Sequence, residues 1–434
     1  MIEHHRRMRL AYALAFLILA GALEAQTSGT IAVKCGSLLD MRSESLRHNV
    51  TVVIQGSRIQ DVAGSPPAGA QTIDLGNATC LPGLMDLHAH IFTDPSIPNV
   101  ADNYLKRSSA AKTLCGLRRA QNMLKNGFTT LRDPSDMDEY FGLVDLKQSL
   151  SRGEFVGPRL FVAPHALTPP GGHADLNDLA PDVAVHSFGK LVSGPDQMRN
   201  AVRNEIKYGA DWIKLYVTGG VMSLHDDPRV QEFTDEEIRA GVEETHRHRK
   251  KITVHAIGTD GIKASVRAGV DSVEHGILID DEGIQMMLDR GTFLVPTLYV
   301  LNYIVQEGEK AGIPAENIAK GRSVIEERDR NLRKAFAAGV NLAFGTDTIF
   351  PEQYAPREFG LLVKLGLTPY RAIRSATLGS AELMGLDKEL GTIERGKLAD
   401  IVAVPGNPLD DVTQLEHVQF VMKEGQVIRN DLRP

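Results

Sequence analysis

Residues 82–90 read PGLMDLHAH, an apolar run that is closed by two histidines. Side chains along a β-strand alternate between its two faces, so His88 and His90 project the same way, and Asp86 shares their side. Two imidazoles on one face can grip a single cation, and a neighbouring carboxylate can orient one of them. The pair alone is a weak signal, because histidines are also common in cores and on surfaces.

This stretch is the first of a series of similar units in the centre of the chain. Each unit is a short apolar run that ends in or near a polar residue, and amphipathic stretches such as 235–249 and 315–338 fit between the runs as helices. The predicted strands cover residues 84–90, 129–133, 160–165, 212–216, 253–255, 272–275, 293–297 and 342–347. Alternating strands and helices of this number predict an α/β fold, a closed (β/α)8 TIM barrel.

Both ends of the chain have a different texture. Short β-type runs separated by turn residues occupy the region after residue 30, and similar runs return at 391–404 and 418–421. We therefore expect a small β-sandwich domain built from residues 26–80 and 389–434, with the barrel spanning residues 81–388.

The first residues resemble an export signal. Arg6, Arg7 and Arg9 precede an apolar run from Leu10 to Ala22, and small residues follow. A charged start, a short apolar stretch and a small-residue cleavage site describe a secretory signal peptide, here residues 1–25. A membrane anchor needs about 20 apolar residues. The prediction is an exported protein, periplasmic or secreted, without a stable membrane anchor after cleavage.

Composition limits the class of partner. The 434 residues carry a formal net charge of −7, so the global field does not favour binding to nucleic acid. The three cysteines are Cys35, Cys80 and Cys115, and none has metal-type spacing. We interpret them as buried or free thiols, and a single disulfide stays open.

More strand ends carry residues that bind metals. His255 ends one predicted strand, His275 ends the next, and Asp347 closes the last. In a barrel of this type the carboxyl ends of the strands meet at one face, where the chemistry lies. Imidazoles together with a carboxylate suit Zn²⁺ or a similar divalent ion. The pattern therefore predicts a metal site at the carboxyl end of the barrel.

These residues also carry a family resemblance. The stretch 82–90, GFTTLRD at 127–133, DWIKLYVTGG at 211–220 and GTD at 345–347, with the two later histidines, resemble the amidohydrolase superfamily. GTIERGKLADIV at 391–402 is similar to the returning β segment of those enzymes. The resemblance covers nearly all of the expected mature chain. It is closest to the metal-dependent prolidase and carboxypeptidase-like group, which includes hydrolases of N-acyl amino acids and of ochratoxin-type amides.

The resemblance implies a two-metal site, with zinc as the expected ion. In the family a lysine matching Lys214 is carboxylated by CO₂, and the carbamate bridges the two ions. The implied ligands are His88, His90 and Asp347 for the first ion, His255 and His275 for the second, and Lys214 for both. A hydroxide shared by the ions would attack the amide, and Asp347 would act as general acid and base.

Candidates for contacting the substrate follow the same strands. His165, at the end of the third strand, is expected to polarise the substrate carbonyl, and His173 in the turn-rich loop PPGGHAD (169–175) is a second candidate. Tyr216 is expected to line the pocket. Arg132 is a candidate for binding a substrate carboxylate, with a salt bridge to a neighbouring aspartate as the equal alternative.

The expected activity is hydrolysis of an amide bond next to a C-terminal amino acid. Substrates would be dipeptides ending in Pro or another hydrophobic residue, N-acyl amino acids and ochratoxin A. Two alternatives stay open: a cyclic-amide hydrolase of the imidazolonepropionase type, or a deaminase, with one metal; and an inactive exported binding protein. We also expect a homo-oligomer, since relatives often assemble.

Overall fold

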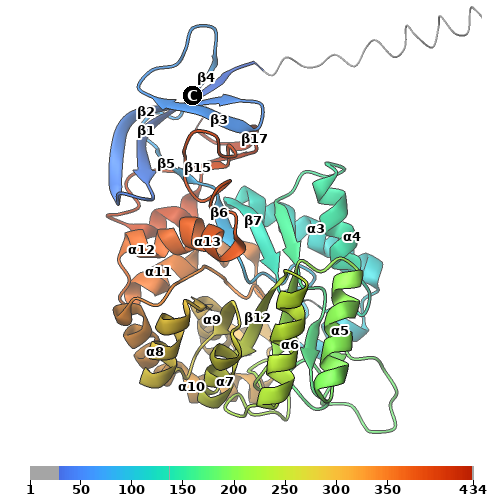
Figure 1. The fold of residues 1–434 in the computed structure, drawn as a ribbon. Helices are drawn as coiled ribbons and strands as arrows, with labels where there is room; N and C mark the ends of the chain where they lie inside the picture. The colour runs from blue at the N-terminus through green and yellow to red at the C-terminus, as the bar shows by residue number, and fades with distance from the viewer. Residues whose placement is uncertain (1–28, 136, 433–434) are drawn as a thin grey trace, which may run out of the picture.

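The computed structural model describes residues 29–135 and 137–432, and the predicted signal peptide lies outside them. Figure 1 shows an α/β body of strands and surrounding helices, with a separate sheet at one end that contains both the first and the last described strands. In the described part of the chain, no helix has the length and apolar character needed to cross a membrane.

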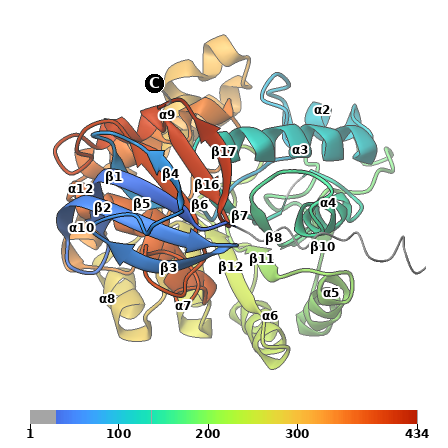
Figure 2. The same cartoon turned by 90° about the horizontal axis from the view of Figure 1, so that it is seen from above.

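The two ends of the chain form one sheet of eight strands. Its order is β17-β16-β15-β5-β1-β2-β3, and β4 pairs with β1 (Figure 2). The bounds are Ile31–Asp40 (β1), Ser45–Gln55 (β2), Arg58–Ala63 (β3), Gln71–Asp74 (β4), Thr79–Pro82 (β5), Ile401–Val404 (β15), Phe420–Lys423 (β16) and Gln426–Asn430 (β17). The expected union of both ends is present as this single sheet, whereas a two-sheet sandwich is not confirmed.

The structure contains a disulfide, a possibility that the sequence left open. Cys35 in β1 is bonded to Cys80 in β5, and Cys115 is a buried free thiol. The disulfide lies in the apolar core of this sheet, among residues such as Val33, Val52 and Ile401. It therefore links strands 45 residues apart in sequence within one core.

The body is built on parallel strands. A three-stranded sheet contains Leu84–Asp86 (β6), Phe128–Asp133 (β7) and Arg159–Val162 (β8). A six-stranded sheet of order β10-β9-β11-β12-β13-β14 contains Ala166–Thr168 (β9), Lys190–Leu191 (β10), Trp212–Tyr216 (β11), Lys251–Ala256 (β12), Ser272–His275 (β13) and Phe293–Val295 (β14). All of these pairings are parallel, as predicted.

Two predicted strands differ from expectation. The third is split into β8 and β9. Pro164 lies between them and explains the break, because proline has no N–H to donate to a neighbouring strand. β8 pairs with β7, while β9 pairs with β11. The eighth, expected at 342–347, makes only an isolated bridge between Leu342 and Leu294.

The 341–347 segment nevertheless connects β14 to the end of β6. Ala343 N donates to Leu294 O at 3.1 Å, and Leu87 N donates to Phe344 O at 2.8 Å. Asp347 N donates to His88 O at 2.6 Å. The last ligand-bearing segment therefore lies beside the first.

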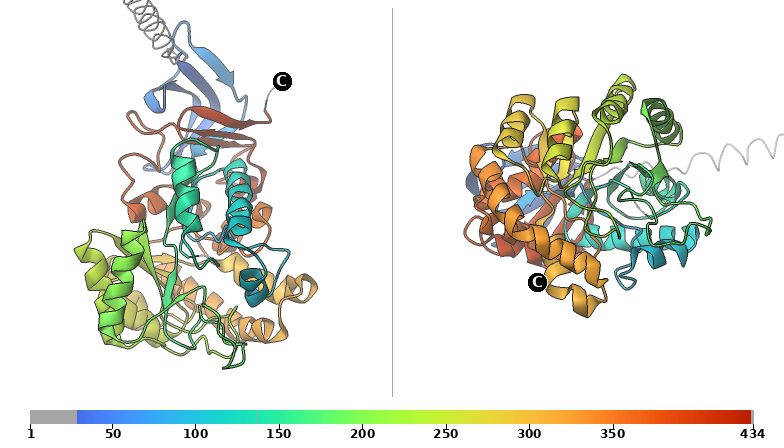
Figure 3. Two further views of the ribbon diagram at one scale, coloured as in Figure 1. Left: turned by 90° about the vertical axis from the view of Figure 1, so that its right-hand side faces the viewer. Right: turned by 90° about the horizontal axis from the view of Figure 1, so that it is seen from below.

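Helices surround the parallel strands (Figure 3). Their bounds are Val100–Leu105 (α2), Ser109–Lys125 (α3), Gly142–Ser151 (α4), Pro195–Lys207 (α5), Asp235–Arg247 (α6), Thr259–Ala268 (α7), Asp281–Arg290 (α8), Leu298–Ala311 (α9), Ala315–Ala338 (α10), Arg357–Lys364 (α11), Pro369–Arg374 (α12) and Ser380–Met384 (α13). Helix α10 has the predicted bounds, and α6 ends two residues before the predicted position. Amphipathic helices cover the sheets because each buries one apolar stripe.

Candidate metal centre

His88 and His90 converge on Asp347 from two segments far apart in sequence. Nε2 of His90 lies 3.1 Å from Oδ1 of Asp347, and Nε2 of His88 lies 3.8 Å from the same oxygen. On the other side of each ring, His88 Nδ1 donates to Glu274 Oε2 at 2.7 Å and His90 Nδ1 donates to Ser135 O at 2.6 Å. Such contacts fix the tautomer and leave Nε2 of each ring to bind a cation.

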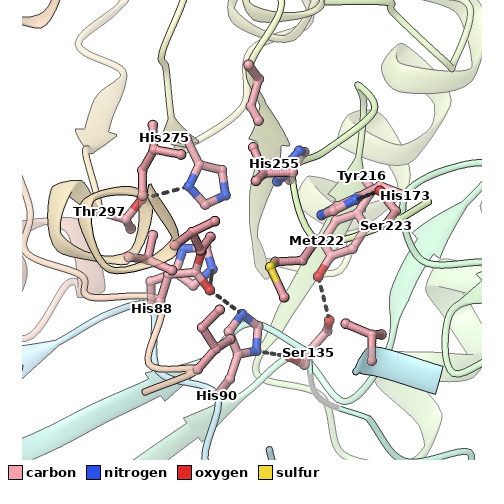
Figure 4. A pocket seen from close by; sticks show the side chains of 18 of the residues that line it. His88, His90, Ser135, His173, Tyr216, Met222, Ser223, His255, His275 and Thr297 are labelled. Atoms are coloured by element: carbon pink, nitrogen blue, oxygen red, sulfur yellow. Dashed lines mark hydrogen bonds and ion pairs between the residues drawn. The ribbon is translucent and has the colours of Figure 1, made fainter. Parts of the chain in front are cut away.

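His255 and His275 continue the group of imidazoles. The His275 ring lies 5.1 Å from that of His88 and 4.6 Å from that of His255 (Figure 4). Nδ1 of His275 bonds to Thr297 Oγ1 at 2.7 Å, and Nε2 of His255 donates to Gly219 O at 3.0 Å. These contacts leave Nε2 of His275 and Nδ1 of His255 as the nitrogens that would face a metal.

Several residues of this site have left-handed backbone conformations. φ is 69° at His275, 45° at Thr297 and 53° at Asp347, although none of them is glycine. Such conformations cost about 1–3 kcal/mol each and cluster at functional sites. Neighbouring side chains of a regular strand point to opposite faces, but the positive φ at His275 breaks this alternation. His275 and its neighbour Glu274 therefore both lie near His88.

Lys214 is fully buried in the middle of β11. No residue in the described part of the chain accepts a hydrogen bond from its Nζ, which lies 5.3 Å from the ring of Tyr216. Burial lowers the pKa of this amine to about 8, and the attraction of Glu274 offsets only part of that effect. A buried amine that loses its proton this readily fits carbamate formation, in which the lone pair of the neutral amine attacks the carbon of CO₂ and an N–H proton is released.

Electrostatics around the site suit cation binding. Burial lowers the pKa of His88 to about 4, and it holds the pKa values of His255 and His275 well below 6.5, so these imidazoles are neutral at pH 7. Burial alone would raise the pKa of Asp347, but the adjacent imidazoles of His88 and His90 bring it below its usual range. Neutral imidazoles and an ionised carboxylate are the forms that bind metal ions.

Arg132 supports the site from beneath rather than facing a substrate. Its side chain is fully buried, with Nη2 2.7 Å from Glu274 Oε1 and Nε donating to Leu87 O at 2.6 Å. The alternative in which Arg132 binds a substrate carboxylate is therefore wrong, and among the described residues its salt bridge is to Glu274. Glu274 was missed from the sequence; its position beside His275 is the only local signal.

His165 does not reach the pocket. Its Nδ1 lies 2.9 Å from Glu205 Oε2, and its Nε2 lies 3.1 Å from Glu139 O. Both nitrogens are occupied in a buried setting beside Phe141, at the break between β8 and β9. The expectation that His165 polarises the substrate carbonyl is corrected for this reason.

His173 and Tyr216 do line the pocket. The His173 ring stacks on that of His255 at 4.3 Å and lies 4.8 Å from the Tyr216 ring. Nδ1 of His173 lies 2.6 Å from Ser223 Oγ, which also bonds to the buried carboxylate of Asp226. A Cβ at Gly220 would lie 1.9 Å from this imidazole, so the ring occupies space that only glycine leaves open.

Lys320 of α10 completes the support for His173. Its Nζ lies 2.6 Å from Asp226 Oδ1, and Asn317 donates to Val221 O at 2.6 Å. Helix α10 therefore holds the loop after β11 against the pocket.

The cavity is lined by the candidate metal ligands and by a set of apolar side chains. It encloses about 840 Å³ of space free of atoms, its open mouth included. Val100, Met137, Phe188, Val221, Met222, Val300, Leu301 and Ile304 are among its apolar lining residues. Sites for small molecules commonly combine such apolar walls with a few placed polar groups.

Comparison with known proteins agrees with this geometry. Residues 79–428 match the model of the amidohydrolase family. The ochratoxinase of Aspergillus niger is 29% identical to this chain over an alignment of 438 positions. The alignment covers 95% of this chain and 89% of that protein. A solved Xaa-Pro dipeptidase with bound methionine is 34% identical, with a TM-score of 0.87 over 93% of this chain and 100% of the other.

A solved prolidase in complex with N-methylphosphonate-L-proline is 30% identical, with a TM-score of 0.84 over 92% of this chain and 100% of the other. The match to the family model covers most of the chain, and the expected resemblance to the prolidase-like group is confirmed. The chain belongs to the amidohydrolase family and is a hydrolase that acts on amide C–N bonds.

Proposed function

We propose that this protein is a two-metal amidohydrolase that releases a C-terminal amino acid from a dipeptide or an N-acyl amino acid. The observation that carries the proposal is Lys214, a buried amine that has no hydrogen-bond partner in the described residues and lies near the buried imidazoles and Asp347. A carbamate there would replace the amine with an anionic oxygen ligand for the proposed ions. The ligands would be His88, His90, Lys214, His255, His275 and Asp347.

The scaffold would be a closed (β/α)8 barrel. β8 and β9 together act as one interrupted strand that joins the two parallel sheets. The backbone bonds of 341–347 to Leu294 on one side and to Leu87 and His88 on the other support closure of the ring. Closure would bring the first and last ligand segments together at one face.

Two bound divalent ions would supply Lewis-acid activation of water and of the amide carbonyl. Asp347 would accept the proton of the attacking water and pass it to the leaving amine. His173 would take the substrate-facing position expected of His165, since its ring lies against His255 in the cavity. The Tyr216 hydroxyl, 3.4 Å from Ser135 Oγ, would help to orient the polar groups of the substrate.

The apolar wall favours a hydrophobic group beside the scissile amide. This agrees with the relatives that carry bound methionine or an N-phosphonate of proline. We therefore propose amides of proline and of hydrophobic amino acids as the substrate class, with ochratoxin A as a further candidate because of the similarity to ochratoxinase.

Metal analysis combined with a substrate screen tests the proposal. We expect two zinc ions per chain, loss of activity with a chelator and recovery when zinc is restored. Dipeptides ending in Pro or Met and N-acetyl amino acids should be cleaved by the zinc-loaded protein. One ion with hydrolysis of cyclic amides alone would favour the imidazolonepropionase-type alternative, and no ion with no hydrolysis would favour a binding protein.

We also propose export of the protein. The disulfide between Cys35 and Cys80 supports this, because disulfides persist mainly in oxidising compartments. Expression of the full chain in a bacterial host should yield a periplasmic product whose N-terminus starts near residue 23 or 26. A cytoplasmic product that retains Met1 would contradict export.

A further inference from the structure

A second apolar recess lies beside the proposed catalytic cavity. This recess, which we call the annex, is partly open and contains about 440 Å³ of space free of atoms, its open mouth included. Ile97, Pro98, Tyr303, Ala311 and Ile313 line it and do not line the catalytic cavity. In the described part of the chain no Asp, Glu, Lys or Arg side chain lines the annex.

The side-chain amide of Asn103, which lines the annex, is already engaged in hydrogen bonds. Asn103 donates through Nδ2 to the backbone oxygens of Asp94 and Ile97, each at 2.9 Å. Its Oδ1 accepts from Asp94 N at 3.2 Å and from Arg107 at 2.8 Å. With this amide engaged, Thr93 and Tyr303 are the other polar residues of a lining that is mainly apolar, and the annex suits an apolar group.

The annex and the catalytic cavity share a dividing wall. Val100, Met137, Met222 and Ile349 line both spaces. Ile349 follows Asp347 by two residues, so the shared wall lies close to the reacting centre. Met222 projects among the site residues in Figure 4. A methionine is unbranched and adaptable, so it can move aside more readily than a branched side chain.

We propose that the annex and the catalytic cavity form one substrate site, and that the annex binds a long or aromatic apolar substituent of the amide. The apolar lining of the annex and the four residues that it shares with the catalytic cavity are the observations that carry this assignment. The proposal rests on the function proposed above. It adds that small amides such as acetylglycine use only part of the site.

Two substrate series test the annex and show which end of the amide enters it. One series lengthens the acyl group on methionine from acetyl to hexanoyl to dodecanoyl; the other keeps acetyl and enlarges the amino acid from glycine to norleucine to biphenylalanine. Each methylene buried in the annex should raise kcat/KM about fourfold until the space is filled. A rise in either series supports the proposal and assigns the annex to that end. A flat response in both overturns it.

Variants show whether the rise of kcat/KM with substituent size comes from the annex. Ala311→Phe should fill the annex and flatten the responding series without lowering kcat/KM for acetylglycine. Met222→Ala should move the optimum to longer groups, whereas Leu224→Ala, on the same loop and outside both linings, should leave the series unchanged. If Ala311→Phe does not fold, Ile97→Trp serves the same purpose. An unaltered series in the filled variant overturns the proposal.

A binding measurement separates this inference from the proposed activity. The neutral fluorescent probe N-phenyl-1-naphthylamine should bind to the metal-free protein and lose about tenfold in affinity in the filled variant. If no amide is cleaved but the probe still responds to the filling, the proposed function fails and the annex stands as an apolar binding site. If amides are cleaved and the probe and both series ignore the filling, the annex fails alone.

Discussion

Asp347→Asn should lower kcat by about a thousandfold and change KM by less than threefold. A positioned general acid and base contributes about 10²–10⁴-fold, and an amide in place of the carboxylate cannot accept the proton. Asp347 lies 3.1 Å from His90 Nε2, so the variant should also weaken the first metal position. Steady-state kinetics on Pro and Met dipeptides, with metal content measured in parallel, would separate the two effects.

The matched control is Asp227→Asn, which changes an exposed aspartate on the loop after β11. It should leave kcat and metal content unchanged. If Asp347→Asn kept full turnover with both ions bound, Asp347 would not be the group that moves the proton.

Lys214→Ala should remove the bridging ligand and reduce turnover by at least a thousandfold. The lysine is fully buried, so its loss leaves an internal space that a small carboxylate can enter. Added acetate or propionate should therefore restore part of the zinc content and part of the activity. Lys214→Arg should not respond to these carboxylates, because the guanidinium fills the space with a permanent positive charge.

Labelled bicarbonate gives a readout that does not depend on activity. The wild-type zinc protein should show a carbamate carbon signal by NMR, and Lys214→Ala should lack it. Lys147→Ala is the control, since Lys147 is half-buried and forms an ion pair with Asp211 at 3.0 Å. Two tightly held zinc ions in Lys214→Ala without added carboxylate would contradict a bridging role.

Local patterns predicted much of the architecture because periodicity is a short-range property. The bounds predicted for α10 agree with the structure, where Pro314 precedes the helix and Gly339 ends it in a left-handed conformation. The predicted strand end at His275 agrees with the structure, and the one at His255 lies one residue before the end of β12, since apolar runs locate buried strands. The strand predicted at 342–347 is absent as a regular strand, because this segment forms only a few backbone hydrogen bonds with its neighbours.

Contacts between residues that lie far apart in the chain could not be predicted from such local patterns. Parity along a strand could not reveal that Glu274 joins His88 and Arg132, because a left-handed residue at 275 interrupts that parity. Along the chain His165 was the first candidate and His173 the second. Buried acceptors occupy the first, while the loop held by α10 places the second against His255.

Residue types at strand ends were therefore enough to predict a metal site and the order of strands and helices, since each depends on a few adjacent positions. The longer motifs carried the family resemblance, and that resemblance implied the ligand set with Lys214. The burial of Lys214 without a hydrogen-bond partner among the described residues, the partner of each imidazole, the Cys35–Cys80 bond and the annex beside Met222 arise from segments that meet only after folding. Burial and close packing determine these features, and both depend on neighbours that lie far away in the chain.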